Sequence, residues 1–204
     1  MAEVKEKKQK GIGEMIKLGF ILVAFAVSSC AVLAIVNNFT APQIAKNKER
    51  KVNEAMVNFF PEEGLTFETI QNFKADTVGP ITVDNIYLAK NGSKIIGGAA
   101  EVTGPTYDQG TIIVGMRKDG TITGINFLKL TDSPGFGLKA NDPTFKLPNG
   151  KTFYGQFEGK NAKEPFIAGQ NFDAISGATV TSVGVASLIN EGSKALFKLF
   201  GEME

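Results

Sequence analysis

An uncharged and almost wholly apolar run from Leu18 to Val36, LGFILVAFAVSSCAVLAIV, constrains the fold of this chain more than any other feature. As a helix, a run of this length crosses the roughly 30 Å of hydrocarbon in a lipid bilayer. A core helix in a soluble protein of this size would rarely be so uniformly apolar. The run therefore predicts one membrane-spanning helix over residues 18–36, in contact with lipid.

A second interpretation of the same run is a lipoprotein signal. The segment Val27-Ser28-Ser29-Cys30 fits a lipobox, in which Cys30 would become the lipidated first residue. The apolar run continues past Cys30 to Val36, as a span would and a cleaved signal need not. The span is therefore favoured, and mass spectrometry of the native N-terminus distinguishes the two.

Basic residues on the two sides of the run are nearly balanced, so they give the orientation only weakly. They are Lys5, Lys7, Lys8, Lys10 and Lys17 before the run, and Lys46, Lys48, Arg50 and Lys51 after it. The positive-inside rule and the close spacing of the first group favour a cytoplasmic N-terminus. We expect residues 1–17 to form a cytoplasmic tail, with the rest of the chain on the outer face of the plasma membrane.

The composition excludes several kinds of chemistry. The chain has no histidine and only one cysteine, so it has no Ser-His or Cys-His pair and no histidine ligand for a metal. One cysteine cannot form an internal disulfide or hold an iron–sulfur cluster. Redox chemistry would therefore require a bound organic cofactor. The formal net charge of +1 gives nucleic-acid binding no electrostatic support.

After the span, the sequence predicts a stalk and then one folded domain. Thr40 can cap a helix with Pro42 in its first turn, and this helix should end before Pro61. We assign residues 37–75 to this stalk helix and a linker. Residues 76–204 have the length of one compact domain.

The domain combines strand signals with a terminal helix. Strands are predicted from about Asp84, in hairpins over Ile86–Ile96 and Ile112–Phe127 with two-residue turns at Asn91-Gly92 and Asp119-Gly120. The similar flanks of these turns indicate either a duplicated hairpin or two independent hairpins. Helical spacing predicts a helix over 183–200, with Val185, Ile189, Leu196, Leu199 and Phe200 on its buried face, Gly192 at a close contact and Gly201 at its end. A short helical turn within 150–161 should pack Phe153 and Phe157 inward. Together these elements predict an α+β fold with an antiparallel sheet and packed helices.

The segment Asp173–Ser182, DAISGATVTS, lies between a small-residue turn and this helix. The first turn of a helix has unpaired N–H groups and the positive end of the helix dipole, which together favour an anion. Gly177 and Ala178 leave space for a phosphate, and Thr179, Thr181 and Ser182 supply hydroxyl groups. Taken alone, Thr179 would more often be an ordinary helix cap.

Three stretches, in the same order, resemble the FMN-binding domain family of bacterial respiratory complexes. They are Gly104–Gly124, Asp132–Gly137 and Asp173–Ser182 with Gly184 after it. The usual family form of the second stretch is Glu-Thr-Pro-Gly-Leu-Gly, whereas this chain has Asp-Ser-Pro-Gly-Phe-Gly. The single span and the sequence Thr40-Ala41-Pro42 also match. The family includes the G subunit of the Rnf ferredoxin:NAD oxidoreductase complex and the C subunit of the sodium-translocating NADH:quinone reductase. The short chain and compact insertions favour the Rnf type.

The resemblance implies that FMN is joined through its phosphate to Thr179, with Thr181 as the neighbouring candidate. Ser176, Gly177, Ala178 and Ser182 would then shape the phosphate site. Asp173 would bind magnesium, guide the modifying enzyme, or only fix the turn through an Asx hydrogen bond. The second stretch would lie against the flavin, with Phe136 or Leu138 covering the ring and Lys139 near it; the alternative is a surface turn. The residues of that loop are Ser133, Pro134, Gly135, Phe136, Gly137, Leu138 and Lys139.

The resemblance also implies how the protein works. It would be an electron-transfer subunit without independent catalytic residues or metal ligands. A separate flavin transferase, using FAD and magnesium, would attach the cofactor. Its partners would be other membrane subunits of the complex, among them a second covalent-flavin subunit and iron–sulfur subunits. The competing class is a non-redox, membrane-anchored module that binds a free phosphate or nucleotide.

Overall fold

The computed structural model describes residues 2–70, 73, 75 and 79–203, with side chains from residue 13 onward, and it divides into two compact units between Glu49 and Arg50. The helix α1 (Ala2–Phe59) makes up the first unit, and its end from Arg50 belongs to the second. The predicted boundary at residue 76 and the side chains of Lys5, Lys7, Lys8 and Lys10 lie outside the described residues.

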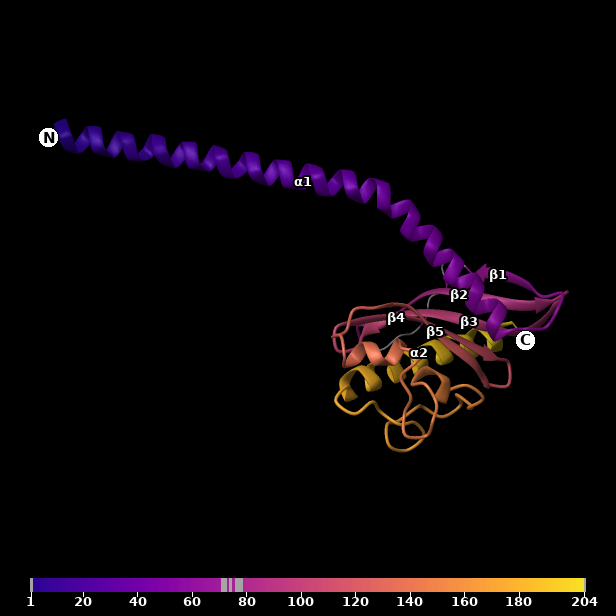
Figure 1. The fold of residues 1–204 in the computed structure, drawn as a ribbon. Helices are drawn as coiled ribbons and strands as arrows, with labels where there is room; N and C mark the ends of the chain where they lie inside the picture. The colour runs from indigo at the N-terminus through magenta and orange to yellow at the C-terminus, as the bar shows by residue number, and fades with distance from the viewer. Residues whose placement is uncertain (1, 71–72, 74, 76–78, 204) are drawn as a thin grey trace. The chain divides into compact units, whose positions relative to one another are not determined.

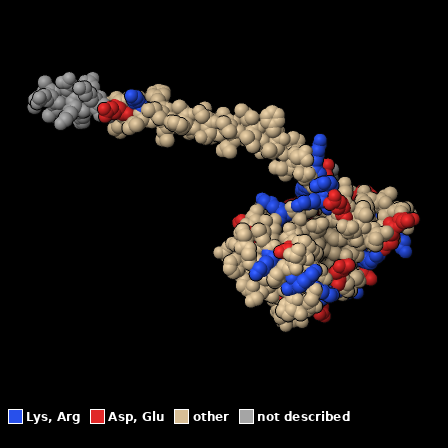
Figure 2. Space-filling view, viewed as in Figure 1, with Lys and Arg blue, Asp and Glu red and all other residues tan. Residues whose placement is uncertain are grey.

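In the first unit, α1 continues without a break through the predicted span. Residues 13–50 are exposed along its length, and its most apolar window has a mean hydropathy of 2.6. Figure 2 shows a long stretch of this helix without a charged residue. Among the described residues it is the one helix long and apolar enough to cross a membrane. The prediction of a membrane helix is confirmed.

The predicted start of a separate stalk helix at Thr40 is wrong. Pro42 lies inside α1, and the Thr40 hydroxyl donates to the carbonyl of Val36 at 2.9 Å instead of capping a new helix. Such a side-chain bond to the carbonyl four residues earlier is typical of a helix interior, and a proline removes only one donor from the ladder. The stalk and the span are therefore one helix.

The second unit is built on a five-stranded antiparallel meander (Figure 1). Its strands are β1 (Thr66–Ile70), β2 (Thr82–Asn91), β3 (Lys94–Pro105), β4 (Gln109–Arg117) and β5 (Ile122–Leu130), paired in sequence order. The helix α2 (Thr179–Glu202) covers one face, and the end of α1 covers the other. The predicted α+β class is confirmed. β1, which pairs with β2, was missed because it is short and mostly exposed.

Both predicted hairpins form, but their turns differ from the prediction. Asn91 pairs with Lys94, so the two turn residues are Gly92 and Ser93, one position later than expected. In the other hairpin Arg117 N–H donates to Thr121 C=O at 2.9 Å, which leaves a three-residue turn. Gly120, with φ of 92°, supplies the positive φ that such a turn requires.

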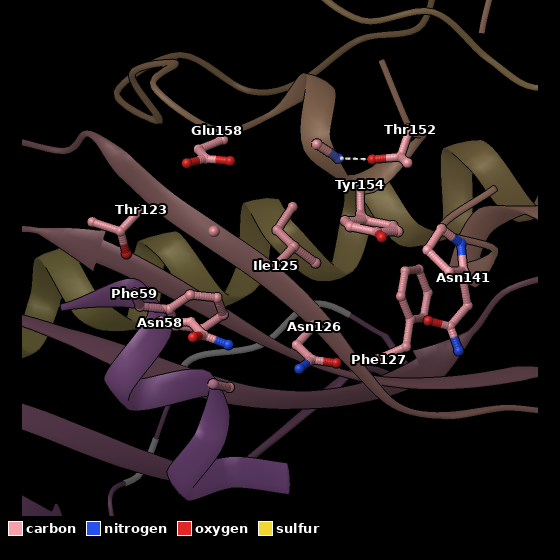
Figure 3. Close-up of a pocket in the computed structure, with 14 residues that line it drawn as sticks. Asn58, Phe59, Thr123, Ile125, Asn126, Phe127, Asn141, Thr152, Tyr154 and Glu158 are labelled. Carbon is pink, nitrogen blue, oxygen red and sulfur yellow. Dashed lines mark hydrogen bonds between the residues drawn. The ribbon is translucent and has the colours of Figure 1, made fainter. Parts of the chain in front are cut away.

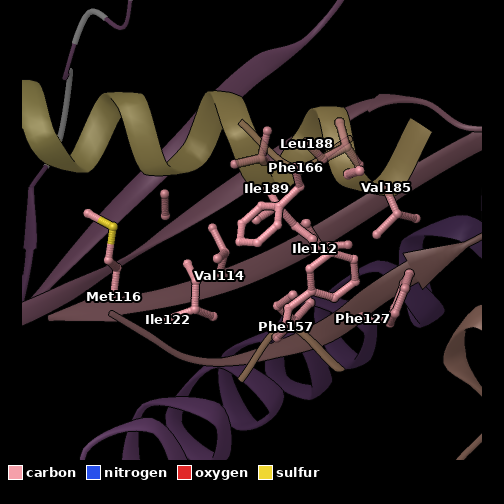
Figure 4. Packing of buried hydrophobic residues seen from close by; sticks show 14 of the residues in the cluster. Ile112, Val114, Met116, Ile122, Phe127, Phe157, Phe166, Val185, Leu188 and Ile189 are labelled. Carbon is pink, nitrogen blue, oxygen red and sulfur yellow. The ribbon is translucent and has the colours of Figure 1, made fainter. Parts of the chain in front are cut away.

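Helix α2 packs its apolar face on the sheet, as its sequence period predicts. Val185, Ile189, Leu196, Leu199 and Phe200 are all buried. Figure 4 shows Val185, Leu188 and Ile189 directed toward the side chains of β4. A Cβ on Gly192 would lie 2.7 Å from Val114 and 2.8 Å from Val102, so this glycine allows the close contact. Helix α2 continues past Gly201, because that glycine keeps helical geometry.

The long segment between β5 and α2 closes the same core. It contains the short helices η1 (Gly137–Asn141) and η2 (Tyr154–Gln156). Phe153 and Phe157 flank η2, are fully buried and meet edge to face at 5.6 Å, as the sequence predicts. On the opposite face of the sheet, the Phe59 ring lies on Gly115 and Gly124, where a Cβ would come within 2.5 Å of it.

Candidate functional site

The second and third family-like stretches, which lie far apart in the sequence, meet around one cavity at the start of α2. This α2 cavity has a volume of about 640 Å³. One wall is the loop after β5, another is the turn and first residues of α2, and the third is the turn between β3 and β4. The lining residues are Tyr107, Ser133, Pro134, Phe136, Gly137, Gly177, Ala178, Thr179, Val180 and Thr181.

The start of α2 has no side-chain cap. Ala178 is the capping residue, with φ of −137°, and Gly177 turns the chain before it with φ of 78°. Thr179 is the first helical residue and is exposed. Within the described part of the chain its hydroxyl makes no hydrogen bond. Thr179 is therefore not an ordinary helix cap, and its hydroxyl is available at the cavity.

This helix start suits a negatively charged group. The N–H groups of the first turn have no partner within the helix, and the helix dipole is positive there. No acidic residue lies in the first turn of α2. A phosphate placed against Thr179 would meet free N–H donors, and no acidic residue of the first helical turn would oppose it.

Asp132 holds the three walls of the cavity together. Asp132 is buried, with 3 % of the residue exposed. It accepts hydrogen bonds from the hydroxyls of Thr106 and Thr181, and from the backbone N–H groups of Tyr107 at 3.2 Å and Asp108 at 3.0 Å. Thr181 belongs to the first turn of α2, while residues 106–108 form the turn between β3 and β4. One side chain thus joins β5, the β3–β4 turn and α2.

These bonds keep Asp132 ionised. Burial alone raises the pKa of a carboxyl group, but the bonds from Thr106, Thr181, Asp108 and Tyr107 outweigh it, and the pKa of Asp132 falls below 3.8. The charge is therefore present at neutral pH and accepts four hydrogen bonds.

Small residues bring the loop and the helix into contact. A Cβ on Gly137 would lie 2.6 Å from both Asp132 Cβ and Thr181 Oγ1, so no larger residue fits without movement. The Phe136 ring lies over the turn before α2, 3.6 Å from where a Cβ of Gly177 would be. Phe136 is nevertheless 59 % exposed, so this ring offers an apolar face to the cavity.

Comparison with known proteins agrees with this geometry. The FMN-binding domain family matches residues 107–194, and the family described as the RnfG N-terminal region matches residues 7–57. The G subunit of the Na(+)-translocating ferredoxin:NAD(+) oxidoreductase complex of Acetobacterium woodii is 31% identical, over 92% of this chain and 94% of that protein. The chain belongs to the family of Rnf G subunits. The G subunits of the ion-translocating oxidoreductase complexes of Aliivibrio fischeri and Shewanella baltica are 29% and 27% identical, over 86% and 82% of this chain.

In this member of the Rnf G-subunit family, several predicted site residues line the cavity and others lie outside its lining. Gly177, Ala178 and Thr179 line it, as do Ser133, Pro134, Phe136 and Gly137. Gly135, with φ of 76°, and Ser176 lie in the adjoining turns and are exposed. Leu138 is half-buried next to Gly137. Lys139 is not among the lining residues, and its Nζ lies 5.3 Å from the centre of the Phe145 ring.

Ser182 and Asp173 hold the turn rather than line the cavity. The buried Ser182 hydroxyl donates to Ala178 C=O and accepts from Ile175 N–H, both at 2.9 Å, so all its bonding within the turn is structural. The Asp173 carboxylate accepts a hydrogen bond from the Asn149 amide at 2.9 Å. The backbone N–H of Asp173 donates to the side-chain carbonyl of Gln156, and its backbone C=O accepts from the Gln156 side-chain N–H. These bonds fix the segment that leads into the turn before α2 in this Rnf-type domain.

Sequence reasoning missed three residues of this site. Tyr107, 69 % exposed, lines the cavity from the β3–β4 turn. Thr106 and Asp132 form the clamp behind it. Asp132 is part of the second family-like stretch, and its acidic character there was the available signal.

The residues present fit an FMN group. The volume lies within the usual range of about 300–1,000 Å³ for small-molecule sites. A helix start without a cap faces the place of a phosphate, and aromatic side chains of Tyr107 and Phe136 line the same cavity. The family match and the cavity therefore point to the same cofactor.

Proposed function

We propose that this protein is a membrane-anchored electron carrier that holds FMN through a phosphoester to Thr179, as one component of an ion-translocating ferredoxin:NAD(+) oxidoreductase complex. The observation that carries the proposal is the start of α2, where Thr179 presents a free, exposed hydroxyl beside an uncapped helix N-terminus. Membership of the Rnf G-subunit family supports the complex as its setting.

Each wall of the cavity has a part in this function. The first N–H groups of α2 would offset the charge of the phosphodiester, and Thr179 Oγ1 would be its protein oxygen. Phe136 and Tyr107 would cover the apolar ring system and exclude water, while Asp132 would keep the three walls in register. When bound, FMN supplies the acceptance and release of one or two electrons.

Attachment of the flavin requires help from another protein. A neutral threonine hydroxyl is a weak nucleophile, and no described side chain accepts a hydrogen bond from Thr179. The nearby carboxylate of Asp132 is occupied by four other donors. We therefore expect a flavin transferase to act on Thr179 before the protein enters its electron-transfer role.

Covalent flavin is tested by fluorescence of the denatured band after co-expression with a flavin transferase. Wild type and Thr179→Ser should fluoresce, because both keep a hydroxyl, whereas Thr179→Val should be dark and still folded. A fluorescent Thr179→Val band would show that the flavin is attached at another residue, and Thr181→Val would be the next variant to test. A dark wild-type band, with the transferase active on another substrate, would favour the phosphate-binding module.

We also propose that the flavin domain lies on the outer face of the membrane, next to a second flavin subunit and iron–sulfur subunits. Continuity of α1 through Cys30 supports a retained span over a cleaved lipid anchor. In a Cys30→Ser background, a cysteine at the exposed Lys163 should react in intact spheroplasts with a maleimide that cannot cross membranes. Labelling only after lysis would reverse the orientation.

A further inference from the structure

The outer edge of β5 forms one side of a second hollow, which we call the β5 groove. β5 is the last strand of the sheet, so β4 is its neighbour on one side only. At its start, Ile122 exchanges backbone hydrogen bonds with Gly159 and Lys160. The next residues, Thr123 to Phe127, line a hollow of about 560 Å³. An edge strand presents unpaired N–H and C=O groups that can bond to another chain.

Two walls flank this edge. Figure 3 shows Asn58 and Phe59, from the end of α1, on one side of β5, and Thr152, Tyr154 and Glu158 on the other. Ala55, Asn141, Pro143 and Gly155 complete the lining. All these residues belong to the second compact unit. The groove is therefore a fixed feature of the folded domain, open along the strand.

Several polar side chains of the β5 groove make no hydrogen bond within the described chain, although Thr152 Oγ1 accepts one from Gly155 N–H at 3.0 Å. In the part of the chain that the structure describes, the side-chain amides of Asn58, Asn126 and Asn141 make no hydrogen bond. Thr123 Oγ1 is buried and also without a partner. Several other amide side chains of the same domain are bonded, namely those of Asn85, Asn149, Gln156, Asn161, Asn171 and Asn190. Three unpaired amides and one unpaired hydroxyl thus gather at one place.

The chemistry of the groove matches a polypeptide backbone. A side-chain amide offers a carbonyl acceptor and N–H donors, which are the groups that a peptide bond can satisfy. A strand edge repeats the same groups every second residue, roughly 6.8 Å apart. A compact small molecule would use only part of this length, whereas an extended chain would follow it.

The charge of the groove restricts the side chains of such a segment. Among the lining residues Glu158 is the one charged group, and it makes no ion pair within the described chain. A segment with a lysine or arginine opposite Glu158 would be favoured, and an acidic segment would be repelled.

We propose that the β5 groove binds an extended, uncharged or basic segment of a neighbouring protein subunit, which adds to β5 as a further strand. The assignment to a neighbouring subunit rests on the proposed function, because that function places the chain in a membrane complex. The occupant pairs with the outer edge of β5, and Asn58, Asn126 and Asn141 bond to its backbone. This mode gives affinity through main-chain bonds and little dependence on sequence.

Hydrogen exchange tests this directly. Amide exchange of residues 123–127 is compared between the isolated full-length chain in detergent and the same chain in its purified complex. Strand addition should slow exchange at the outward-facing amides by roughly tenfold or more in the complex. Equal exchange in both samples would overturn the proposal. Protection already present in the isolated chain and lost on gel filtration would identify a small molecule instead, and would also overturn it.

A matched pair of variants on α1 makes the test specific. Asn58→Arg places a long cation in the lining of the groove, on the wall opposite Glu158, whereas Asn53→Arg adds the same charge at an exposed position outside the lining. The first should remove the protection of residues 123–127 and the second should keep it. Protection unchanged by Asn58→Arg would contradict the proposal. A photo-reactive residue at position 58 should then cross-link to one contiguous segment of a single neighbouring protein.

The same samples separate this inference from the proposed function. Covalent flavin at Thr179 is measured by mass spectrometry in every preparation. Asn58→Arg should leave that flavin in place, because the groove shares no lining residue with the α2 cavity. If β5 is protected in a complex whose Thr179 carries no flavin, the result would support strand addition at the β5 groove and contradict flavin attachment at Thr179.

Discussion

The two hollows of the folded domain differ in how their polar groups are satisfied. Around the α2 cavity, Asp132 bonds to Thr106 and Thr181 behind the surface, and the Thr179 hydroxyl makes no hydrogen bond within the described residues. Along the β5 groove, the amides of Asn58 and Asn126 have no partner among the described residues. A site whose polar groups bond to one another is rigid before its ligand arrives, while amides open to solvent can exchange water for the groups of a partner.

This difference suits the two proposed occupants. A cofactor attached once and kept for the life of the protein benefits from walls that are already fixed. A neighbouring protein can supply its own donors and acceptors on assembly. The variants that follow separate the two hollows, because each should affect one and spare the other.

The largest effect should come from Asp132→Ala. The change leaves two hydroxyls and two backbone N–H groups without their acceptor in a buried site, which should cost about 3 kcal/mol or more of unfolding free energy. It should also lower flavin attachment, since the walls lose their connection. Urea unfolding and in-gel fluorescence measure the two effects. Asp132→Glu, which restores the acidic residue usual in the family, should recover part of both.

The same carboxylate should make stability depend on pH. The pKa of Asp132 in the folded protein lies below its ordinary value of 3.8. Its stabilisation is therefore complete above the unfolded-state pKa and is lost as the pH falls through the lower, folded-state pKa. The difference in unfolding free energy between wild type and Asp132→Asn should be constant near neutral pH and shrink below about pH 4. A difference that grows in acid would contradict the assignment.

A smaller effect is expected from Gly137→Ala. Its Cβ would come within 2.6 Å of Thr181 Oγ1 and push the loop away from α2, at a cost of about 1–3 kcal/mol. Gly135→Ala is the control, because nothing lies within 4 Å of its Cβ position. Its cost should come from φ of 76° alone, about 1–2 kcal/mol. Only Gly137→Ala should slow flavin attachment. If the two variants attach flavin at the same rate, Gly137 has no part in the flavin site.

The sequence predicts the elements of this fold better than the contacts between them. The period of α2 identifies its buried residues, and the apolar run identifies the membrane helix, because each is a local pattern. The Asp132 clamp joins residues that are 26 and 49 positions apart, so no local pattern contains it. The first residue of α2 is equally hard to predict, since a helix start depends on the turn before it.

The β5 groove shows the same limit more strongly. Asn58 and Asn126 have no distinctive spacing and come from a helix and a strand. The end of α1 lies beside β5 because its buried residues pack on the sheet, with the Phe59 ring on Gly115 and Gly124. The predicted turn positions were wrong and β1 was missed for a related reason. Pairing with the neighbouring strands determines where these turns and this strand lie, and the local sequence has only a weak preference there.

Phe136→Ala should change the flavin with little change in stability. The ring is 59 % exposed, so its removal should alter the unfolding free energy by less than about 1 kcal/mol. Loss of an apolar cover would admit water to the flavin and shift its midpoint potential, with the flavin still attached. Redox titration of the labelled protein measures this shift. An unchanged potential would make residues 133–138 an ordinary surface turn.

The smallest effect on the isolated chain should come from Asn126→Leu, and this gives the comparison its sharpest test. The Asn126 amide has no partner within the described domain, so its loss should change the unfolding free energy by no more than about 0.5 kcal/mol. Gln156→Leu is the matched change at a bonded amide that is 2 % exposed. It removes bonds to Phe153 C=O and to both backbone groups of Asp173, and should cost about 1–3 kcal/mol. In the complex the order should change, because Asn126→Leu would then remove bonds to the added strand and weaken retention of this chain. Equal stability losses for the two variants in the isolated chain would show that Asn126 is already satisfied within the domain, and the contrast between the hollows would fail.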